Sequence, residues 1–120
     1  MDLVEKIVAL HQTLDEAGLP HAFGGALALA WCTFRARGTI DIDINIFIPA
    51  EDFMRAINAL PSGVAASKKD LAQLKQDGQV RLWWDKTPLD LFLNTTDFHS
   101  DVMQRMRWEM FGGEQVPFLA

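Results

Sequence analysis

The chain has 120 residues, 49% of them hydrophobic, and this length fits one domain that can bury a core without disulfides. Sixteen acidic and eleven basic residues give a formal net charge of −5, which argues against nonspecific nucleic-acid binding. The single cysteine, Cys32, excludes an internal disulfide, no apolar run reaches the ~18 residues of a membrane span, and the first residues lack a signal-peptide pattern. We therefore expect a cytoplasmic protein without membrane contact.

Apolar periodicity, capping residues and turn residues predict the elements of the chain. In chain order we expect a helix over 2–17, a strand over 21–23, a helix over 26–34, a strand over 39–48, helices over 51–60 and 68–77, a hairpin over 79–93 and a helix over 97–110. The expected fold is a single α/β (α+β) domain over 1–120, with a mixed, mostly antiparallel sheet flanked by helices. The apolar end, 116–120, is expected to be exposed and to contact a protein partner or a second copy of the chain.

The expected strand over 39–48 alternates strictly between isoleucine and other residues. Because side chains of a strand point to opposite faces in turn, the isoleucines share one buried face. The opposite face carries Thr39, Asp41, Asp43, Asn45 and Phe47. Two carboxylates on one face repel each other unless a bound cation offsets their charge. Hard dications such as Mg²⁺ take oxygen ligands of this kind.

The predicted hairpin adds a third carboxylate to this face. A four-residue turn at 85–88 would pair Trp84 with Leu89 and Trp83 with Asp90. Asp90 then lies on the face of its strand that points away from the core. Trp83 is expected to line a pocket beside Asp90, whereas Trp84 is expected in the core.

Gly24-Gly25, Asp41-Ile42-Asp43 and Asp90 form an ordered set of residues that suits nucleotidyl transfer. Glycines let the backbone approach phosphate oxygens, and the start of a helix offers free amides. Three carboxylates can hold two divalent ions, which neutralise a triphosphate and activate an attacking hydroxyl. Histidines 11, 21 and 99 have no partner at metal-ligand spacing, and none is expected to be a ligand.

These residues resemble the DNA-polymerase-β-like nucleotidyltransferase superfamily, in which a Gly-Gly or Gly-Ser helix start precedes an Asp-x-Asp strand and a later Asp. The segments 23–28 and 37–43 are most similar to its minimal bacterial branch, which includes toxins of toxin–antitoxin systems and small antibiotic nucleotidyltransferases. The resemblance covers about residues 20 to 95. It implies the nucleotidyltransferase fold and metal-dependent transfer of a nucleoside monophosphate from a nucleoside triphosphate, such as ATP, to an acceptor hydroxyl, with release of pyrophosphate.

The resemblance also implies the role of each site residue. Asp41, Asp43 and Asp90 would be catalytic and would bind Mg²⁺ or Mn²⁺. The nucleotide would contact the residues Gly24, Gly25, Arg37 and Thr39. Arg37 has a second interpretation, an ion pair with one of the two aspartates that holds the empty site together. The acceptor is a small molecule, a tRNA or a protein side chain.

The chain departs from the family pattern in two ways. Gly25 stands where many relatives carry serine, so a hydroxyl contact to phosphate would be missing. Minimal members often carry a helical domain after the catalytic one, and we expect such a region to be missing from this chain. Both departures favour an alternative function, a catalytically inactive nucleotide- or protein-binding module derived from the same fold.

Overall fold

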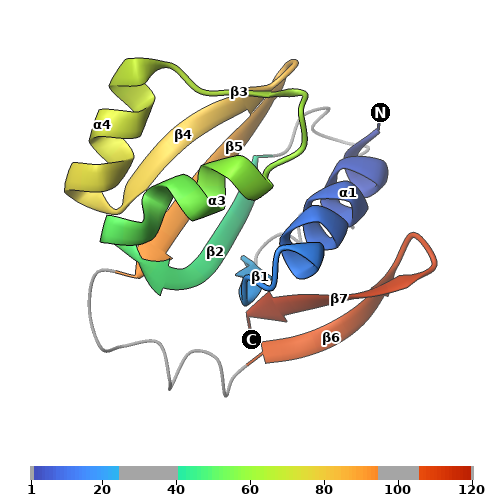
Figure 1. Ribbon diagram of the computed structural model, residues 1–120. Helices are drawn as coiled ribbons and strands as arrows, with labels where there is room; N and C mark the ends of the chain where they lie inside the picture. The colour runs from blue at the N-terminus through green and yellow to red at the C-terminus, as the bar shows by residue number, and fades with distance from the viewer. Residues whose placement is uncertain (1, 25–40, 95–105, 120) are drawn as a thin grey trace.

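The computed structural model describes residues 2–24, 41–94 and 106–119 of the chain. Its elements are α1 (Leu3–Glu16), β1 (His21–Phe23), β2 (Ile42–Pro49), the 3-10 turn η1 (Ala50–Asp52), α3 (Phe53–Ala59), β3 (Val64–Ala65), α4 (Lys68–Asp77), β4 (Gln79–Trp84), β5 (Thr87–Asn94), β6 (Met106–Phe111) and β7 (Glu114–Leu119) (Figure 1). The expected helix over 26–34 lies outside the described residues, as do the candidate site residues Gly25, Arg37 and Thr39.

The described strands form one mixed sheet in the order β3-β4-β5-β2-β1-β7-β6. The pairs β2–β5 and β1–β7 are parallel, and the other four neighbouring pairs are antiparallel. This arrangement confirms the expected α+β class and the mixed, mostly antiparallel sheet. β2, which carries the alternating isoleucines, lies at the centre of the sheet.

The core fills one face of this sheet. Ile42, Ile44 and Ile46 are fully buried and belong to one apolar cluster with the inward side chains of α1, α3 and α4. The helices therefore cover the isoleucine face, and α1 and α3 lie on the same side of the sheet in Figure 1. The opposite face of β2 carries Asp43, which is only half-buried. No helix within the described parts of the chain has the length and apolar character needed to cross a bilayer.

The helix ends follow the local sequence. Asp2 and Glu5 form a capping box at the start of α1, and Ser67 and Asp70 form another at the start of α4. Each such cap stabilises a helix by about 1 kcal/mol. Gly78 adopts a left-handed conformation with φ of 72° and ends α4, which a residue without a Cβ does at no steric cost. Such end signals are local, and the structure confirms the predicted helices over 2–17 and 68–77.

The register of the β4–β5 hairpin differs from the prediction. Trp84 pairs with Thr87, so Asp85 and Lys86 alone form the turn, and Asp85 takes the left-handed φ of 55° that a two-residue turn favours. Trp83 consequently lies opposite Pro88, and Arg81 lies opposite Asp90. The predicted pairing of Trp83 with Asp90 is therefore wrong, although the slip of two residues keeps every side chain on its predicted face.

The end of the chain also differs from the prediction. Residues 106–110, expected in a helix, belong to β6, which turns at Gly112-Gly113 into β7. β7 is paired on both sides, with β1 and β6. Val116 and Phe118 are fully buried, and so the expectation of an exposed apolar end is wrong for these residues.

Candidate functional site

A row of four residues crosses the sheet on the face opposite the helices. Asp43 of β2 lies directly opposite Asp90 of the parallel strand β5, and Asp90 lies opposite Arg81 of β4. On the other side of β2, the Gly24 N–H donates a hydrogen bond of 2.9 Å to the Asp43 carbonyl oxygen. Three strands and the residue that follows β1 thus place two carboxylates, a guanidinium and a glycine side by side.

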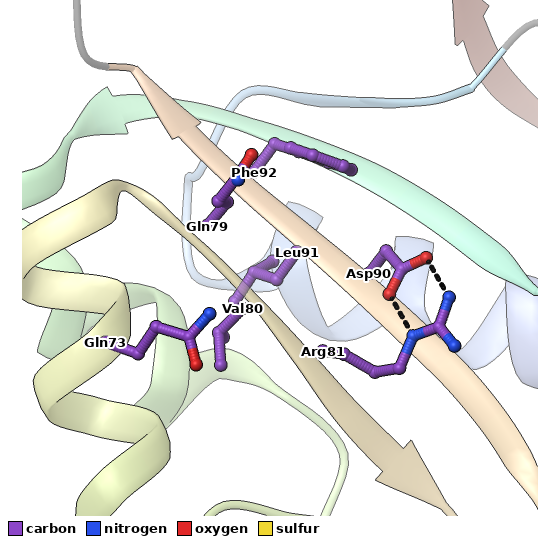
Figure 2. Close-up of a pocket in the computed structure, with 7 residues that line it drawn as sticks. All are labelled: Gln73, Gln79, Val80, Arg81, Asp90, Leu91 and Phe92. Atoms are coloured by element: carbon purple, nitrogen blue, oxygen red, sulfur yellow. Dashed lines mark hydrogen bonds and ion pairs between the residues drawn. The ribbon is translucent and has the colours of Figure 1, made fainter.

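Arg81 binds two of the three aspartates. Its Nε and Nη2 donate to the two carboxylate oxygens of Asp90 at 2.7 and 2.9 Å, and Figure 2 shows this two-pronged contact. The same Nη2 donates to Asp41 Oδ2 at 2.9 Å. Bidentate hydrogen bonds between arginine and a carboxylate have a fixed geometry and are stronger than hydrogen bonds between neutral groups. Arg81 therefore links Asp41 to Asp90 and neutralises part of their charge.

The carboxyl groups of this row differ in proton affinity. Burial raises the pKa of Asp43, and the negative charge of Asp90 and a hydrogen bond shared with it raise it further. The hydrogen bonds from Arg81 lower the pKa of Asp90. The contact with Asp90 in turn raises the pKa of the Arg81 guanidinium, which stays charged. Asp90 is thus the firmly ionised member of the pair, and Asp43 is the member that gains a proton more readily.

Gly24 lies against the side chain of Asp43. A Cβ atom at position 24 would lie 3.0 Å from the Asp43 Cβ and 3.5 Å from its Oδ2. The first distance is tighter than ordinary van der Waals contact, so any larger residue would push Asp43 away from its place. The backbone after β1 approaches a carboxylate closely at this point because residue 24 has no side chain.

The surface around the row is shallow. A hollow of about 170 Å³ adjoins it, lined by Gln73, Gln79, Val80, Arg81, Asp90, Leu91 and Phe92 (Figure 2). Pockets that enclose small molecules have volumes of roughly 300–1,000 Å³. The described residues around this row therefore form an open surface and not a pocket that would enclose a small molecule. Trp83, expected beside Asp90, lies two residues beyond Arg81 on β4 and has 48% of its surface exposed.

The donor atoms of this row suit a hard dication. Carboxylate oxygens from Asp41, Asp43 and Asp90 are the ligand type that Mg²⁺ prefers. The pKa of Asp43 is raised first by burial and then by the negative charge of Asp90, and a cation would relieve that repulsion. Among residues 2–24, 41–94 and 106–119, however, no three His, Cys, Asp or Glu side chains stand ready as a metal site. Arg81 occupies the carboxylate oxygens that a metal ion would use.

The structure thus brings together four of the candidate residues, Gly24, Asp41, Asp43 and Asp90. Sequence reasoning missed Arg81, and it would have found this residue if the hairpin had been given its two-residue turn. The ion-pair role considered for Arg37 is filled by Arg81 in the described part of the chain. Comparisons with protein-family models, curated proteins and solved structures find no match for this chain.

A second polar contact was also missed. His11 of α1 is not isolated, because its Nδ1 lies 2.9 Å from the Nε2 of His21. His21 Nδ1 lies 2.8 Å from the Leu19 carbonyl oxygen, which only accepts. His21 therefore donates from Nδ1, and its Nε2 accepts from His11. Burial lowers the pKa of His21, so the ring is neutral at pH 7.

Proposed function

We propose that this protein transfers a nucleoside monophosphate from a nucleoside triphosphate to an acceptor hydroxyl and releases pyrophosphate, with Mg²⁺ or Mn²⁺ as cofactor. The observation that carries the proposal is the meeting of Asp41, Asp43 and Asp90 on one sheet face beside the close approach of Gly24 to Asp43. The chain offers these residues in the order glycine, Asp-x-Asp and later Asp, which is the order of the nucleotidyltransferases it resembles.

In this proposal the three aspartates would hold the metal ions, whose charge would neutralise the triphosphate and favour ionisation of the attacking hydroxyl. Asp90 is a weak base, because Arg81 lowers its pKa. We therefore assign it to orienting the acceptor hydroxyl and binding metal more than to removing the proton. The acceptor oxygen would form a bond to the α-phosphorus as the bond from that phosphorus to the bridging oxygen breaks. The electron pair of the broken bond would leave with pyrophosphate, and the hydroxyl proton would pass to solvent.

Arg81 has a place in the same proposal. A guanidinium and a divalent cation compete for the carboxylates of Asp41 and Asp90, because both neutralise the same oxygens. A guanidinium released from these oxygens presents the same pair of N–H donors to a phosphate. Arg81 would thus bridge the two carboxylates in the free protein and contact the triphosphate in the complex.

The second candidate is a nucleotide- or protein-binding module that has lost transfer activity. The observation that favours it is the contact of Arg81 with two of the three carboxylates, which gives the cluster an internal counter-ion. In that case the row is a structural ion-pair network. Both candidates keep the sheet and its charged face, and they differ in whether pyrophosphate is released.

The first experiment is a thermal-stability screen with each of the four nucleoside triphosphates, with and without Mg²⁺ or Mn²⁺. A ligand that binds the native state raises the melting temperature by mass action. We expect a metal-dependent rise with at least one nucleotide and its loss in Asp43→Asn, followed by release of pyrophosphate when a small-molecule, tRNA or protein acceptor is supplied. Binding without pyrophosphate release would favour the inactive module, and no rise at millimolar ligand would overturn the nucleotide site.

A further inference from the structure

The strand β6 lies at one end of the sheet within the part of the chain that the structure describes. It bears two large apolar side chains on its surface, Trp108 with 54% and Met110 with 65% of the surface exposed. Exposed strand edges are usually protected by proline or lysine, since unpaired backbone groups pair readily with another chain. The sequence of β6, Met-Arg-Trp-Glu-Met-Phe, contains neither residue.

The backbone groups at this edge can be assigned from the hairpin geometry. Gly112-Gly113 is a two-residue turn, so the flanking pair Phe111 and Glu114 is a hydrogen-bonded pair, and hydrogen-bonded pairs recur at every second residue. The pair Trp108–Pro117 falls on the alternate, non-hydrogen-bonded positions, which agrees with the missing N–H of Pro117. The N–H and C=O groups of residues 106, 108 and 110 therefore point away from β7, toward the edge at which no described strand pairs with β6.

The sequence of this edge complements itself. In an antiparallel pair of two β6 strands centred on Trp108, each Trp108 lies opposite its copy, and each Met106 lies opposite a Met110. Arg107 of each copy then lies opposite Glu109 of the other copy, which gives two such Arg–Glu pairs. The pairs at 106, 108 and 110 use the outward backbone groups, while the Arg–Glu pairs take the non-hydrogen-bonded positions, where side chains approach most closely.

The charges at these positions are available for such a contact. Arg107 and Glu109 lie 3.9 Å apart within one strand, and their side chains are 61% and 47% exposed. An ion pair at this distance and exposure contributes little to the stability of the monomer. Opposite charges placed across two strands fix register and orientation more than they add affinity.

We propose that two copies of the chain associate through antiparallel pairing of β6 with β6, centred on Trp108, so that the two sheets join into one. The occupant of this edge is a second copy of the chain because both the charge order and the outward backbone groups are symmetric about one residue. The contact involves a single short strand, and contacts of this size are weak or transient. The dimer should therefore form in the micromolar range.

The first test is sedimentation equilibrium over protein concentrations from about 1 to 500 μM, the range in which a contact of this size populates both states. We expect a concentration-dependent shift from monomer to dimer. In Trp108→Pro the outward N–H at the centre of the contact is lost, but the bonds of β6 to β7 are kept, because residue 108 does not bond to β7. This variant should stay monomeric with an unchanged circular dichroism spectrum.

The second test reverses the charges. In Glu109→Arg, both cross-strand pairs of residues 107 and 109 become two arginines, and in Arg107→Glu both become two glutamates. Because like charges then lie opposite each other, each single variant should weaken the dimer at least tenfold. The double variant Arg107→Glu with Glu109→Arg restores opposite charges and keeps the net charge of −5, so its dimer should recover. Arg55→Glu serves as control, since Arg55 pairs loosely with Asp52 on α3 and η1 and changes charge away from β6.

A monomeric wild type at every concentration would overturn the proposal, as would a Trp108→Pro dimer of wild-type affinity. A double variant as weak as the single ones would contradict the register centred on Trp108. Loss of native circular dichroism in Trp108→Pro would leave the decision to the charge-reversal set, whose substitutions lie on exposed side chains.

Discussion

Asp43 and Asp90 lie directly opposite each other on two parallel strands, and their surroundings shift their pKa values in opposite directions. Asp90 is stabilised as a carboxylate by the two hydrogen bonds from Arg81. Asp43 is partly buried and shares a hydrogen bond with the negatively charged Asp90, and both raise its pKa. Two adjacent carboxyl groups with different proton affinities are a common feature of catalytic sites.

Replacing Asp43 by asparagine should stabilise the free protein at neutral pH. The folded-state pKa of Asp43 is raised, so the ionised side chain destabilises the fold at pH values above that pKa. Asp43→Asn removes this charge, and we expect a gain of about 0.5 kcal/mol in the free energy of unfolding, measured by urea denaturation at pH 7.

The pH dependence distinguishes this cause from a general charge effect. The gain should shrink as pH falls through the folded-state pKa of Asp43 and vanish below 3.8, where wild-type Asp43 becomes protonated in both the folded and the unfolded state. Asp52→Asn changes the net charge equally at an exposed position and should give no such gain. A loss of stability in Asp43→Asn at pH 7 would contradict the conclusion that burial and the neighbouring Asp90 raise the pKa of Asp43.

Removing the guanidinium of Arg81 should make the fold depend on cations. In Arg81→Gln the carboxylates of Asp41 and Asp90 lose their counter-ion, so the melting temperature should fall at low salt. Millimolar Mg²⁺ should then raise it by more than in the wild type, because the ion no longer competes with an arginine. Arg55→Gln, which loses only an exposed 4.0 Å contact with Asp52, is the matched control. Equal responses to Mg²⁺ in both variants would show that the aspartates do not bind the ion.

Adding a methyl group at Gly24 should disturb the site more than the fold. In Gly24→Ala the new Cβ meets the Asp43 side chain at 3.0 Å, so Asp43 must shift by a few tenths of an ångström. We expect a fall in the melting-temperature response to Mg²⁺ and nucleotide. Gly18→Ala is the comparison, since it strains a left-handed φ of 71° without any neighbour near the new atom. It should lower stability by about 1 kcal/mol and keep the ligand response, and an identical ligand response in both variants would argue against a role for Gly24.

Acid should destabilise the protein through His21. Burial lowers the folded-state pKa of His21 below 6.5, so the unfolded chain takes up a proton more readily than the folded one. Stability from the neutral ring is present above pH 6.5 and is lost as pH falls below it. We expect the free energy of unfolding to fall between pH 7 and pH 5, with a weaker slope in His21→Gln. A wild-type stability that is flat across this range would refute the prediction.

Local signals allowed much of the first half of the fold to be predicted. The capping boxes of α1 and α4 and the left-handed Gly78 depend on residues within one helical turn, so sequence alone identifies them. The strand at 21–23 and the buried isoleucines of β2 follow from short apolar patterns. The face that carries Asp43 and Asp90 was predicted because strand alternation survives an error of two residues in register.

The errors have physical causes of their own. Pro88 was assigned to the turn, but it fits inside β5 because its non-hydrogen-bonded pairing with Trp83 requires no N–H. The β6–β7 hairpin was missed although Gly112-Gly113 is a two-residue turn signal, since the residues before it suggested a helix. Arg81 was missed because the assignment of Pro88 to the turn shifted the predicted β4–β5 register, and only the correct register places Arg81 opposite Asp90.

The parallel pairing of β2 with β5 has a kinetic consequence. Parallel neighbours require a crossover, and here the chain passes through α3, β3, α4 and β4 before β5 returns beside β2. Asp43 and Asp90 therefore meet only after this long crossover has closed, and closing such long-range contacts slows folding. A ligand of the aspartate row would then slow unfolding and leave the rate of folding nearly unchanged.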